Sequence, residues 1–137
     1  MSLPRIAVTT GDPAGIGPEV CLKLLANPEV LEICQPIIFG DASVLNKAAE
    51  ECGLPRPEKV VHRLEDATES CVLDFKKIAA DDYVTGNINA ATGHAGYHYV
   101  TEAIDAALAK NVDAITTGPL NKEALRMADV PFPGHTE

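Results

Sequence analysis

Short apolar runs alternate along the chain with longer stretches in which apolar and polar residues recur at helical spacing. The apolar runs are rich in Ile and Val, which favours buried strands. They predict strands at Arg5–Thr10, Pro36–Gly40, Lys59–Leu64 and Ala114–Thr117. The stretch from residue 65 to residue 82 is ambiguous, because Val72–Phe75 fits either a strand or the apolar part of a poor helix.

The intervening stretches predict helices at Gly17–Ala26, Ala42–Cys52, Tyr99–Lys110 and Asn121–Ala128. The third of these has the clearest pattern. Its apolar residues keep the 3.6-residue period and predict one buried face, formed by Val100, Ile104, Ala107 and Leu108.

Local signals set the ends of several elements. Pro18 suits the first turn of a helix, Asp41 suits the N-cap of the next, and Gly53 suits its C-terminal stop. Residues 83–97 hold three glycines and two asparagines, which predicts a loop or a helix entry. Two prolines make residues 130–137 extended.

Strands that alternate with helices predict an α/β fold, a three-layer sandwich with a largely parallel sheet and helices on both faces. The 137 residues have the size of one domain, and 46% hydrophobic residues can supply its core. No internal repeat or low-complexity tract interrupts the pattern. Charge, hydropathy and cysteine spacing argue against a nucleic-acid binder, a membrane-spanning protein and a disulfide-bonded protein. The net charge of −9 argues against nucleic acid or an anionic membrane as partner, and no apolar run approaches the roughly 18 residues of a membrane span. No signal peptide is visible at the N-terminus. Cys21, Cys34, Cys52 and Cys71 form no CxxC pair, which favours reduced, mostly buried thiols in a cytoplasmic protein.

Three loops are candidates for chemistry at the carboxyl ends of the strands, where the ligands of parallel sheets bind. The first is Thr9–Glu19, with the sequence TTGDPAGIGPE. It matches neither the GxGxxG fingerprint nor a P-loop. Asp12 and Glu19 would repel a phosphate and suit a ribose, a hydroxyl or a cation better. The alternative is a tight turn before a helix that starts with proline.

The second segment, Thr116–Ala124, places Lys122 at the head of a helix, where its ammonium can hold a carboxylate or a phosphate. The alternative is a solvated surface lysine. The third segment, Gly134 to Glu137, sets His135 beside a hydroxyl and a carboxylate, which suits a substrate clamp or an acid–base group.

The other histidines give weaker signals. His94 and His98 are four residues apart, a spacing for metal ligands on a helix, but Gly93 and Gly96 argue against that helix. His62 follows an apolar pair, so we interpret it as structural or exposed. We assign no metal site to these residues.

Three motifs together resemble the 4-hydroxythreonine-4-phosphate dehydrogenases of vitamin B6 (pyridoxal phosphate) biosynthesis. They are TTGDPAGIGPE at Thr9–Glu19, ITTGPLNK at Ile115–Lys122 and FPGHTE at Phe132–Glu137, in the order found in that family. The block YVTEAIDAALAKNVDAITTGP is also similar to the family. The match covers essentially the whole chain.

The resemblance implies an NAD-dependent oxidation of 4-phosphohydroxy-L-threonine to a β-keto acid that then loses carbon dioxide. It implies a divalent metal (Zn, Mg or Co) that polarises the reacting oxygen. It also implies a fold similar to that of the isocitrate and isopropylmalate dehydrogenases. In that fold two α/β domains flank an active-site cleft that a homodimer completes, and NAD binds without the Rossmann fingerprint.

Carried over residue by residue, His135 and Thr136 match the family's substrate-binding pair. Lys122, with Asn121 beside it, matches a loop that faces the cleft, and Asp12 matches an acidic position of the first loop. The exact roles of these cleft candidates stay open, and no metal ligand is carried over.

Family members are much longer than this chain, and the resemblance places their metal-binding histidines and phosphate-binding basic residues in the part that it lacks. We therefore expect an N-terminal portion, with residues 1–129 forming the first part of an α/β domain and residues 130–137 starting the crossing into a second domain. We expect little or no catalysis from this portion alone.

Two alternatives remain at this point. One is a paralogue that acts on another four-carbon phosphorylated hydroxy acid, such as threonate or erythronate 4-phosphate. The other is a non-catalytic α/β binding module. A flavodoxin-like phosphate or nucleotide binder is disfavoured by the acidic first loop and by the 4% content of aromatic residues.

Overall fold

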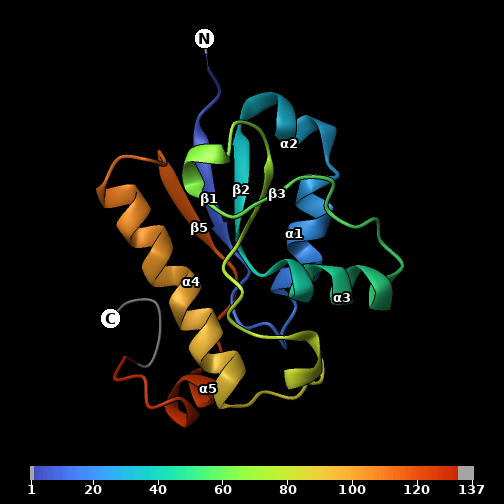
Figure 1. Ribbon diagram of the computed structural model, residues 1–137, viewed down its shortest axis with the longest axis vertical. Coiled ribbons are helices and arrows are strands. Elements are labelled where there is room, and N and C mark those ends of the chain that lie inside the picture. Colours follow the sequence, from blue (N-terminus) through green and yellow to red (C-terminus); the bar gives the residue numbers. More distant parts are fainter. Residues whose placement is uncertain (1, 133–137) are drawn as a thin grey trace.

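A computed structural model describes residues 2–132 and shows a five-stranded sheet in which every strand pairing is parallel (Figure 1). The strands lie in the order β3-β4-β2-β1-β5. Their bounds are Arg5–Thr9 (β1), Gln35–Gly40 (β2), Val60–Val61 (β3), Cys71–Asp74 (β4) and Ala114–Thr117 (β5). The predicted α/β class with a parallel sheet is therefore confirmed.

Five α-helices occur within the described residues; the first four lie between strands, and the fifth follows β5. They are α1 (Gly17–Leu25), α2 (Pro28–Ile33), α3 (Ala42–Cys52), α4 (Ala90–Leu108) and α5 (Lys122–Met127). Two short 3₁₀ turns, η1 (Leu64–Asp66) and η2 (Ala80–Asp82), complete the connections. None of the helices in residues 2–132 is long and apolar enough to cross a membrane.

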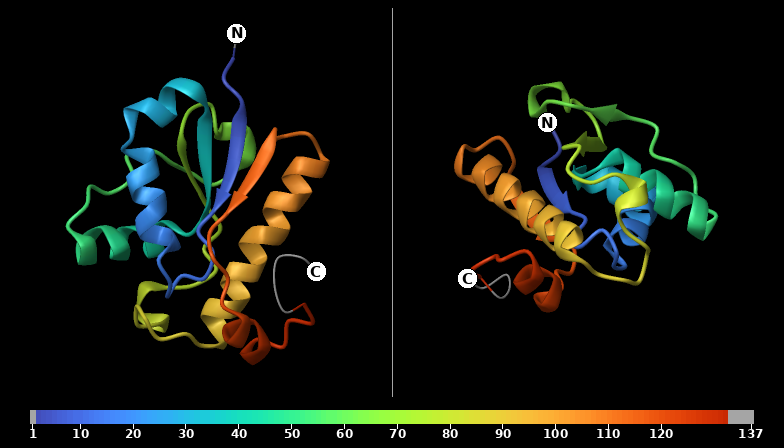
Figure 2. Two further views of the ribbon diagram at one scale, coloured as in Figure 1. Left: turned by 180° about the vertical axis from the view of Figure 1, so that it is seen from behind. Right: turned by 60° about the horizontal axis from the view of Figure 1, so that its bottom comes forward.

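Successive residues of the central strands point to opposite faces of the sheet and so build two cores. On one face, Ala7, Ile37 and Phe39 pack with α4. On the other, Val8 and Ile38 pack with residues of α1 and α3. Figure 2 shows the resulting layers, with α4 on one side of the sheet and α1 and α3 on the other.

Of the two alternatives for Val72–Phe75, the structure has the strand: β4 pairs with β2 on one side and with β3 on the other. One predicted strand is much shorter than expected. The predicted strand Lys59–Leu64 is reduced to Val60–Val61, because the chain turns into η1 at Leu64. As an outer strand, β3 pairs on one side only and few ladder hydrogen bonds extend it.

The clearest predicted helix begins nine residues earlier than its pattern indicated, at Ala90. Residues 90–97 of the stretch predicted as a loop or a helix entry are therefore helical. Asn89 starts it, because its side chain accepts a hydrogen bond from the N–H of Thr92. Gly93 does not break the helix. A Cβ at Gly93 would overlap the carbonyl oxygen of Ala124, so the missing side chain lets α5 pack closely against α4.

Of the four residues that keep the helical period, Val100 and Ala107 are half-buried, and Ala107 packs against the core. The residues that α4 buries are Thr92, Gly93, Ala95, Gly96, Tyr99, Ala103 and Ala106, which are mostly small. Small residues let the helix axis approach the sheet, while Ile104 and Leu108 remain 44% and 77% exposed.

All four cysteines are free, with Cys21 and Cys71 buried, Cys34 half-buried and Cys52 exposed.

Candidate functional site at the carboxyl end of the sheet

The segments that follow β1, β2, β4 and β5 gather at one end of the sheet, because the strands are parallel (Figure 1). The first and last of these segments are the two loops predicted from motifs. Their contact is direct: the N–H of Gly118 donates to the carbonyl oxygen of Thr9 at 2.8 Å. The N–H of Asp12 donates to the carbonyl oxygen of Pro119 at 3.0 Å. Motifs more than 100 residues apart in the sequence thus form one surface.

Asp12 lies inside its own loop and is only 3% exposed. Its Oδ1 accepts a hydrogen bond from the N–H of Ala14 at 2.8 Å, while its Oδ2 is buried without a hydrogen bond. Burial raises the pKa of Asp12, against the opposing effects of the Ala14 N–H and the Thr92 hydroxyl. In this structure the carboxylate shapes the loop, and its contact with a ligand stays a prediction.

Asn121 and Lys122 stand at the start of α5. The side-chain oxygen of Asn121 accepts a hydrogen bond from the N–H of Ala124 at 3.0 Å, so this amide caps the helix. Lys122 is exposed, which leaves its ammonium accessible to an anion at the end of the sheet. The predicted substrate pair, His135 and Thr136, lies outside the described residues.

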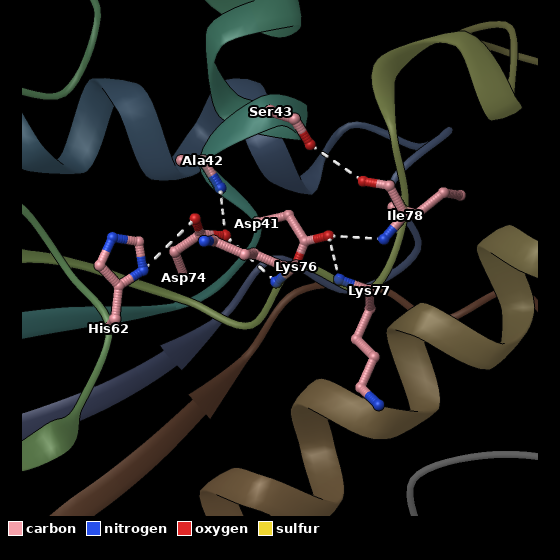
Figure 3. Close-up of polar contacts among 8 residues, drawn as sticks. All are labelled: Asp41, Ala42, Ser43, His62, Asp74, Lys76, Lys77 and Ile78. Carbon is pink, nitrogen blue, oxygen red and sulfur yellow. Dashed lines mark hydrogen bonds and ion pairs between the residues drawn. The ribbon is translucent and has the colours of Figure 1, made fainter.

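Sequence reasoning missed a second polar cluster at the same end of the sheet, formed around Asp74 at the end of β4 (Figure 3). Asp74 Oδ1 accepts hydrogen bonds from the N–H groups of Ala42, at 3.1 Å, and Lys76, at 3.2 Å. Asp74 Oδ2 lies 3.8 Å from Nδ1 of the exposed His62. A signal was present, since an acidic residue directly follows the apolar run Cys71–Leu73.

Asp41 occupies the N-cap position of α3, as predicted, but its carboxylate makes no capping bond. It is fully buried, and its Oδ2 accepts the N–H groups of Lys77 at 2.6 Å and Ile78 at 2.7 Å. Ser43 Oγ adds a hydrogen bond to the carbonyl oxygen of Ile78 at 2.9 Å. Together these bonds fasten the turn after β4 to the start of α3 (Figure 3).

Asp41 also interacts with Tyr99 of α4. Asp41 Oδ1 and the Tyr99 hydroxyl are both buried, and neither has a hydrogen-bond partner. Burial raises the pKa of Asp41 above its ordinary value, and the hydroxyl of Tyr99 and the two N–H groups oppose that rise. Burial, followed by the Asp41 charge, likewise raises the pKa of Tyr99. The carboxylate thus joins the end of β2 to the turn after β4, and it lies in the electrostatic field of the Tyr99 hydroxyl on α4.

A cavity of about 500 Å³ opens beside this cluster. Ser43, Asp74, Lys76, Lys77 and Asp82 are among its lining residues. Lys76 and Lys77 are exposed, so they bring positive charge to this end of an acidic chain. Asp74 and Asp82 line the same cavity, so its charged side chains are balanced between the two signs.

His94 and His98 do lie on one helix, contrary to the expectation from Gly93 and Gly96. His94 is exposed, whereas His98 packs edge-on against Phe75, with ring centroids 5.4 Å apart. His98 Nε2 lies 3.6 Å from Oε1 of Glu102. Burial, with a smaller contribution from Lys77, lowers the pKa of His98. Within residues 2–132, no three His, Cys, Asp or Glu side chains form a group that could hold a metal ion.

Comparison with known proteins gives the family of this chain. The model of the family "Pyridoxal phosphate biosynthetic protein PdxA" matches residues 32–137. A protein of Symbiobacterium thermophilum, provisionally named D-threonate 4-phosphate dehydrogenase, is 40% identical over 98% of this chain. This chain spans 41% of the length of that relative.

Two solved structures agree with the family match. The 4-hydroxythreonine-4-phosphate dehydrogenase of Burkholderia phymatum covers 100% of this chain with a TM-score of 0.90 and 37% identity. The enzyme of the same name from Klebsiella pneumoniae covers 99% with a TM-score of 0.87 and 35% identity. In each case the match takes 42% of the solved chain. The resemblance drawn from the three motifs is confirmed: this chain belongs to the PdxA family of dehydrogenases.

Proposed function

We propose that this chain forms the N-terminal part of an enzyme that oxidises the secondary hydroxyl of a four-carbon phosphorylated hydroxy acid. The observation that carries this proposal is the family match, together with the joined loops of β1 and β5 at the end of the sheet. The oxidation transfers a hydride from carbon to NAD and a proton to a base. A ketone β to the carboxylate results, which then loses carbon dioxide.

Two substrates satisfy this chemistry, and a separate observation favours each. The solved relatives are named as 4-hydroxythreonine-4-phosphate dehydrogenases, which favours 4-phosphohydroxy-L-threonine and a role in vitamin B6 biosynthesis. The curated relatives carry the provisional name D-threonate 4-phosphate dehydrogenase, which favours that acid. The two substrates differ at C2, where an ammonium group replaces a hydroxyl.

The described residues serve this reaction by position and charge. Lys122 offers an exposed ammonium for an anionic group of the substrate or of NAD, and Asn121 fixes the helix start that carries it. Asp12 holds the β1 loop against the β5 loop. We propose that His135 and Thr136 bind the substrate, as the family motif implies.

The divalent metal of the proposal does not fit the described part of this chain, because no suitable group of ligands occurs in residues 2–132. Its ligands then belong to the remaining polypeptide of the enzyme. We propose that the complete enzyme is a cytoplasmic homodimer.

The test uses a chimaera, in which the part of the Symbiobacterium relative that follows its matched region is joined after Glu137 of this chain. Each candidate substrate is supplied with NAD and Mg²⁺, Co²⁺ or Zn²⁺, and formation of NADH is followed by absorbance. We expect turnover of one of the two acids by the chimaera and none by the 137-residue chain. A folded chimaera that oxidises neither acid with any of these metals would contradict the proposal.

A matched pair of variants tests the role of Lys122. Lys122→Met is expected to lower kcat/KM of the chimaera about 10- to 100-fold, the loss typical of one charge-assisted contact. Lys23→Met removes an exposed lysine of α1, on a helix that covers one face of the sheet, and is expected to leave kcat/KM unchanged. Equal effects of the two changes on kcat/KM would show that Lys122 does not belong to the site.

A further inference from the structure

A cavity of about 370 Å³ lies between α4 and the short turn η1, on the face of the sheet that α4 covers. Ala106 of α4 and Ala109, which follows the helix, line it with methyl groups only, so the helix leaves this space open. The cavity shares no described lining residue with the cavity beside Asp74. We call it the α4–η1 cavity, and none of the roles proposed above uses it.

The floor of the α4–η1 cavity is apolar and partly aromatic. Phe39 of β2 and Leu73 of β4 contribute buried side chains, and Phe75 is half-buried directly after β4. The rings of Phe39 and Phe75 have centroids 5.6 Å apart and are tilted by 47°. The face of an aromatic ring attracts a cation, and the ring also packs against an apolar group. The floor therefore suits an apolar body that carries a positive charge.

The carboxylates around this floor give the cavity one sign of charge. Glu102 and Asp105 are three residues apart, a spacing that places them on one flank of α4, and Glu65 lines the cavity from η1. No lysine or arginine is among its described lining residues. The cavity beside Asp74 differs, because its two signs of charge are balanced. The α4–η1 cavity thus favours a cation over an anion.

One of the three carboxylates is free to bind a ligand. Glu65 Oε2 lies 3.5 Å from Nε of Arg63. Glu102 Oε1 lies 3.6 Å from Nε2 of His98. The carboxylate of Asp105 has no hydrogen bond or ion pair with any residue in the described range 2–132. Asp105 is exposed at the rim of the cavity, so it is the group most available to an incoming cation.

We propose that the α4–η1 cavity binds a small organic ammonium ion with an apolar or aromatic body. The ammonium group lies against Asp105 and Glu102, and the body lies on Phe75 and Leu73. The volume is sufficient, because ligand sites in proteins usually measure about 300–1,000 Å³. A bare metal ion does not fit, since no three His, Cys, Asp or Glu side chains in residues 2–132 form a suitable group. The proposal does not depend on the oxidation proposed above.

Calorimetric titration with three matched probes tests the class of ligand. The probes are 2-phenylethylammonium, the neutral 2-phenylethanol and the anionic 3-phenylpropionate. Both the 137-residue chain and the chimaera are titrated, because both hold every residue named for the cavity. We expect the ammonium probe to bind with a Kd of about 1 mM or lower and the other two to bind at least about tenfold more weakly. Equal affinities for the ammonium and the alcohol, or no binding of the ammonium by folded protein, would overturn the proposal.

Two variants of equal charge test the carboxylate. Asp105→Asn is expected to raise the Kd of 2-phenylethylammonium about tenfold, because it removes the free carboxylate of the cavity. Glu32→Gln is the matched control, since Glu32 is an exposed carboxylate of α2 that does not line the cavity, and it should leave the Kd unchanged. Both residues are exposed, so neither change disturbs the core. Equal effects would assign the binding to the overall negative charge of the chain and overturn the proposal.

The position of the ligand is tested separately. Ala109→Leu places a larger side chain at the rim, on an exposed residue, and should weaken binding of 2-phenylethylammonium at least about tenfold. In NMR spectra of the wild-type chain, the probe should shift amide signals of residues 62–65, 73–75 and 102–111. Shifts confined to the loops after β1 and β5 would place the ammonium at the candidate site, and unchanged binding by Ala109→Leu would exclude the cavity; either result overturns the proposal.

Discussion

The backbone N–H of Asp12 donates to the carbonyl oxygen of Pro119, and this 3.0 Å hydrogen bond joins the loop after β1 to the loop after β5. Such close approach depends on Gly11, which precedes Asp12 and has a φ of +72°. A Cβ at this position would overlap the Pro119 carbonyl oxygen. The geometry of the candidate site therefore depends on a residue that carries no functional group.

Gly11→Ala is expected to destabilise the chain by about 2–4 kcal/mol, because it combines backbone strain with a clash against rigid backbone. Gly53 provides the control, since its φ is +67° and an added Cβ would meet nothing within 4 Å. Gly53→Ala should cost only the left-handed strain, about 1 kcal/mol. Urea unfolding measures both, and equal losses would show that the contact with Pro119 is unimportant.

The sequence pattern predicted most strands and helices because each has a local signal. Pro18 begins a helix, Gly53 ends one, and Ile and Val mark β1 and β2. The start of α4 was missed because Gly93 has the local signature of a helix breaker. Its reason for being glycine is the Ala124 carbonyl, 31 residues further along the chain (124 − 93), and no local pattern reports such a contact.

The candidate site likewise has parts that local sequence motifs predicted and parts that depend on tertiary contacts. The glycine-rich loop of β1 and the loop of β5 were recognisable from their motifs, and both lie at the carboxyl end of the sheet. Asp41 was predicted to cap a helix through its side chain, because Asp at an N-cap usually does so. It instead binds the N–H groups of Lys77 and Ile78, whose position depends on how β4 pairs with β2. Partners fixed by tertiary pairing lie beyond local sequence rules.

Lys47 of α3 should contribute to stability through the segment that leads to α4. Its Nζ donates to the carbonyl oxygens of Ala80, at 2.7 Å, and Tyr83, at 2.6 Å. It also lies 3.9 Å from the centroid of the Tyr83 ring. Lys47→Met removes these contacts and is expected to lower the free energy of unfolding by about 1–3 kcal/mol.

Lys23→Met is the control for that change. Lys23 is largely exposed, and its Nζ makes one long ion pair, 3.9 Å from Oε2 of Glu19 on the same helix. Its effect on the free energy of unfolding should stay within about 0.5 kcal/mol. Urea unfolding at fixed pH gives both values. A loss at Lys47 no larger than at Lys23 would show that the two carbonyl contacts add nothing.

Asp41 should make stability depend on pH. Its folded-state pKa is raised above 3.8, so the folded chain holds the Asp41 proton more tightly than the unfolded chain. The resulting stability is fully present below pH 3.8 and is lost as the pH rises through the raised pKa. Asp41→Asn, which keeps an oxygen acceptor for Lys77 and Ile78, should remove this loss.

The measurement is urea unfolding of wild type and Asp41→Asn from about pH 3 to about pH 8. The free energy of unfolding of the variant, minus that of wild type, should increase with pH and then level off. Asp41→Ala leaves both N–H groups without an acceptor and should cost about 3 kcal/mol throughout. A difference between Asn and Asp that falls with rising pH would contradict the raised pKa.

His98 should make the free energy of unfolding depend on pH in the opposite sense to Asp41. Burial lowers its folded-state pKa below 6.5, so the neutral form is favoured in the folded chain. The stability that results is present above pH 6.5 and is lost as the pH falls through the lowered pKa. His98→Gln does not titrate, so the wild-type advantage over this variant should shrink on acidification. Parallel pH profiles for wild type and His98→Gln would mean that packing against Phe75 leaves the His98 proton equilibrium unchanged.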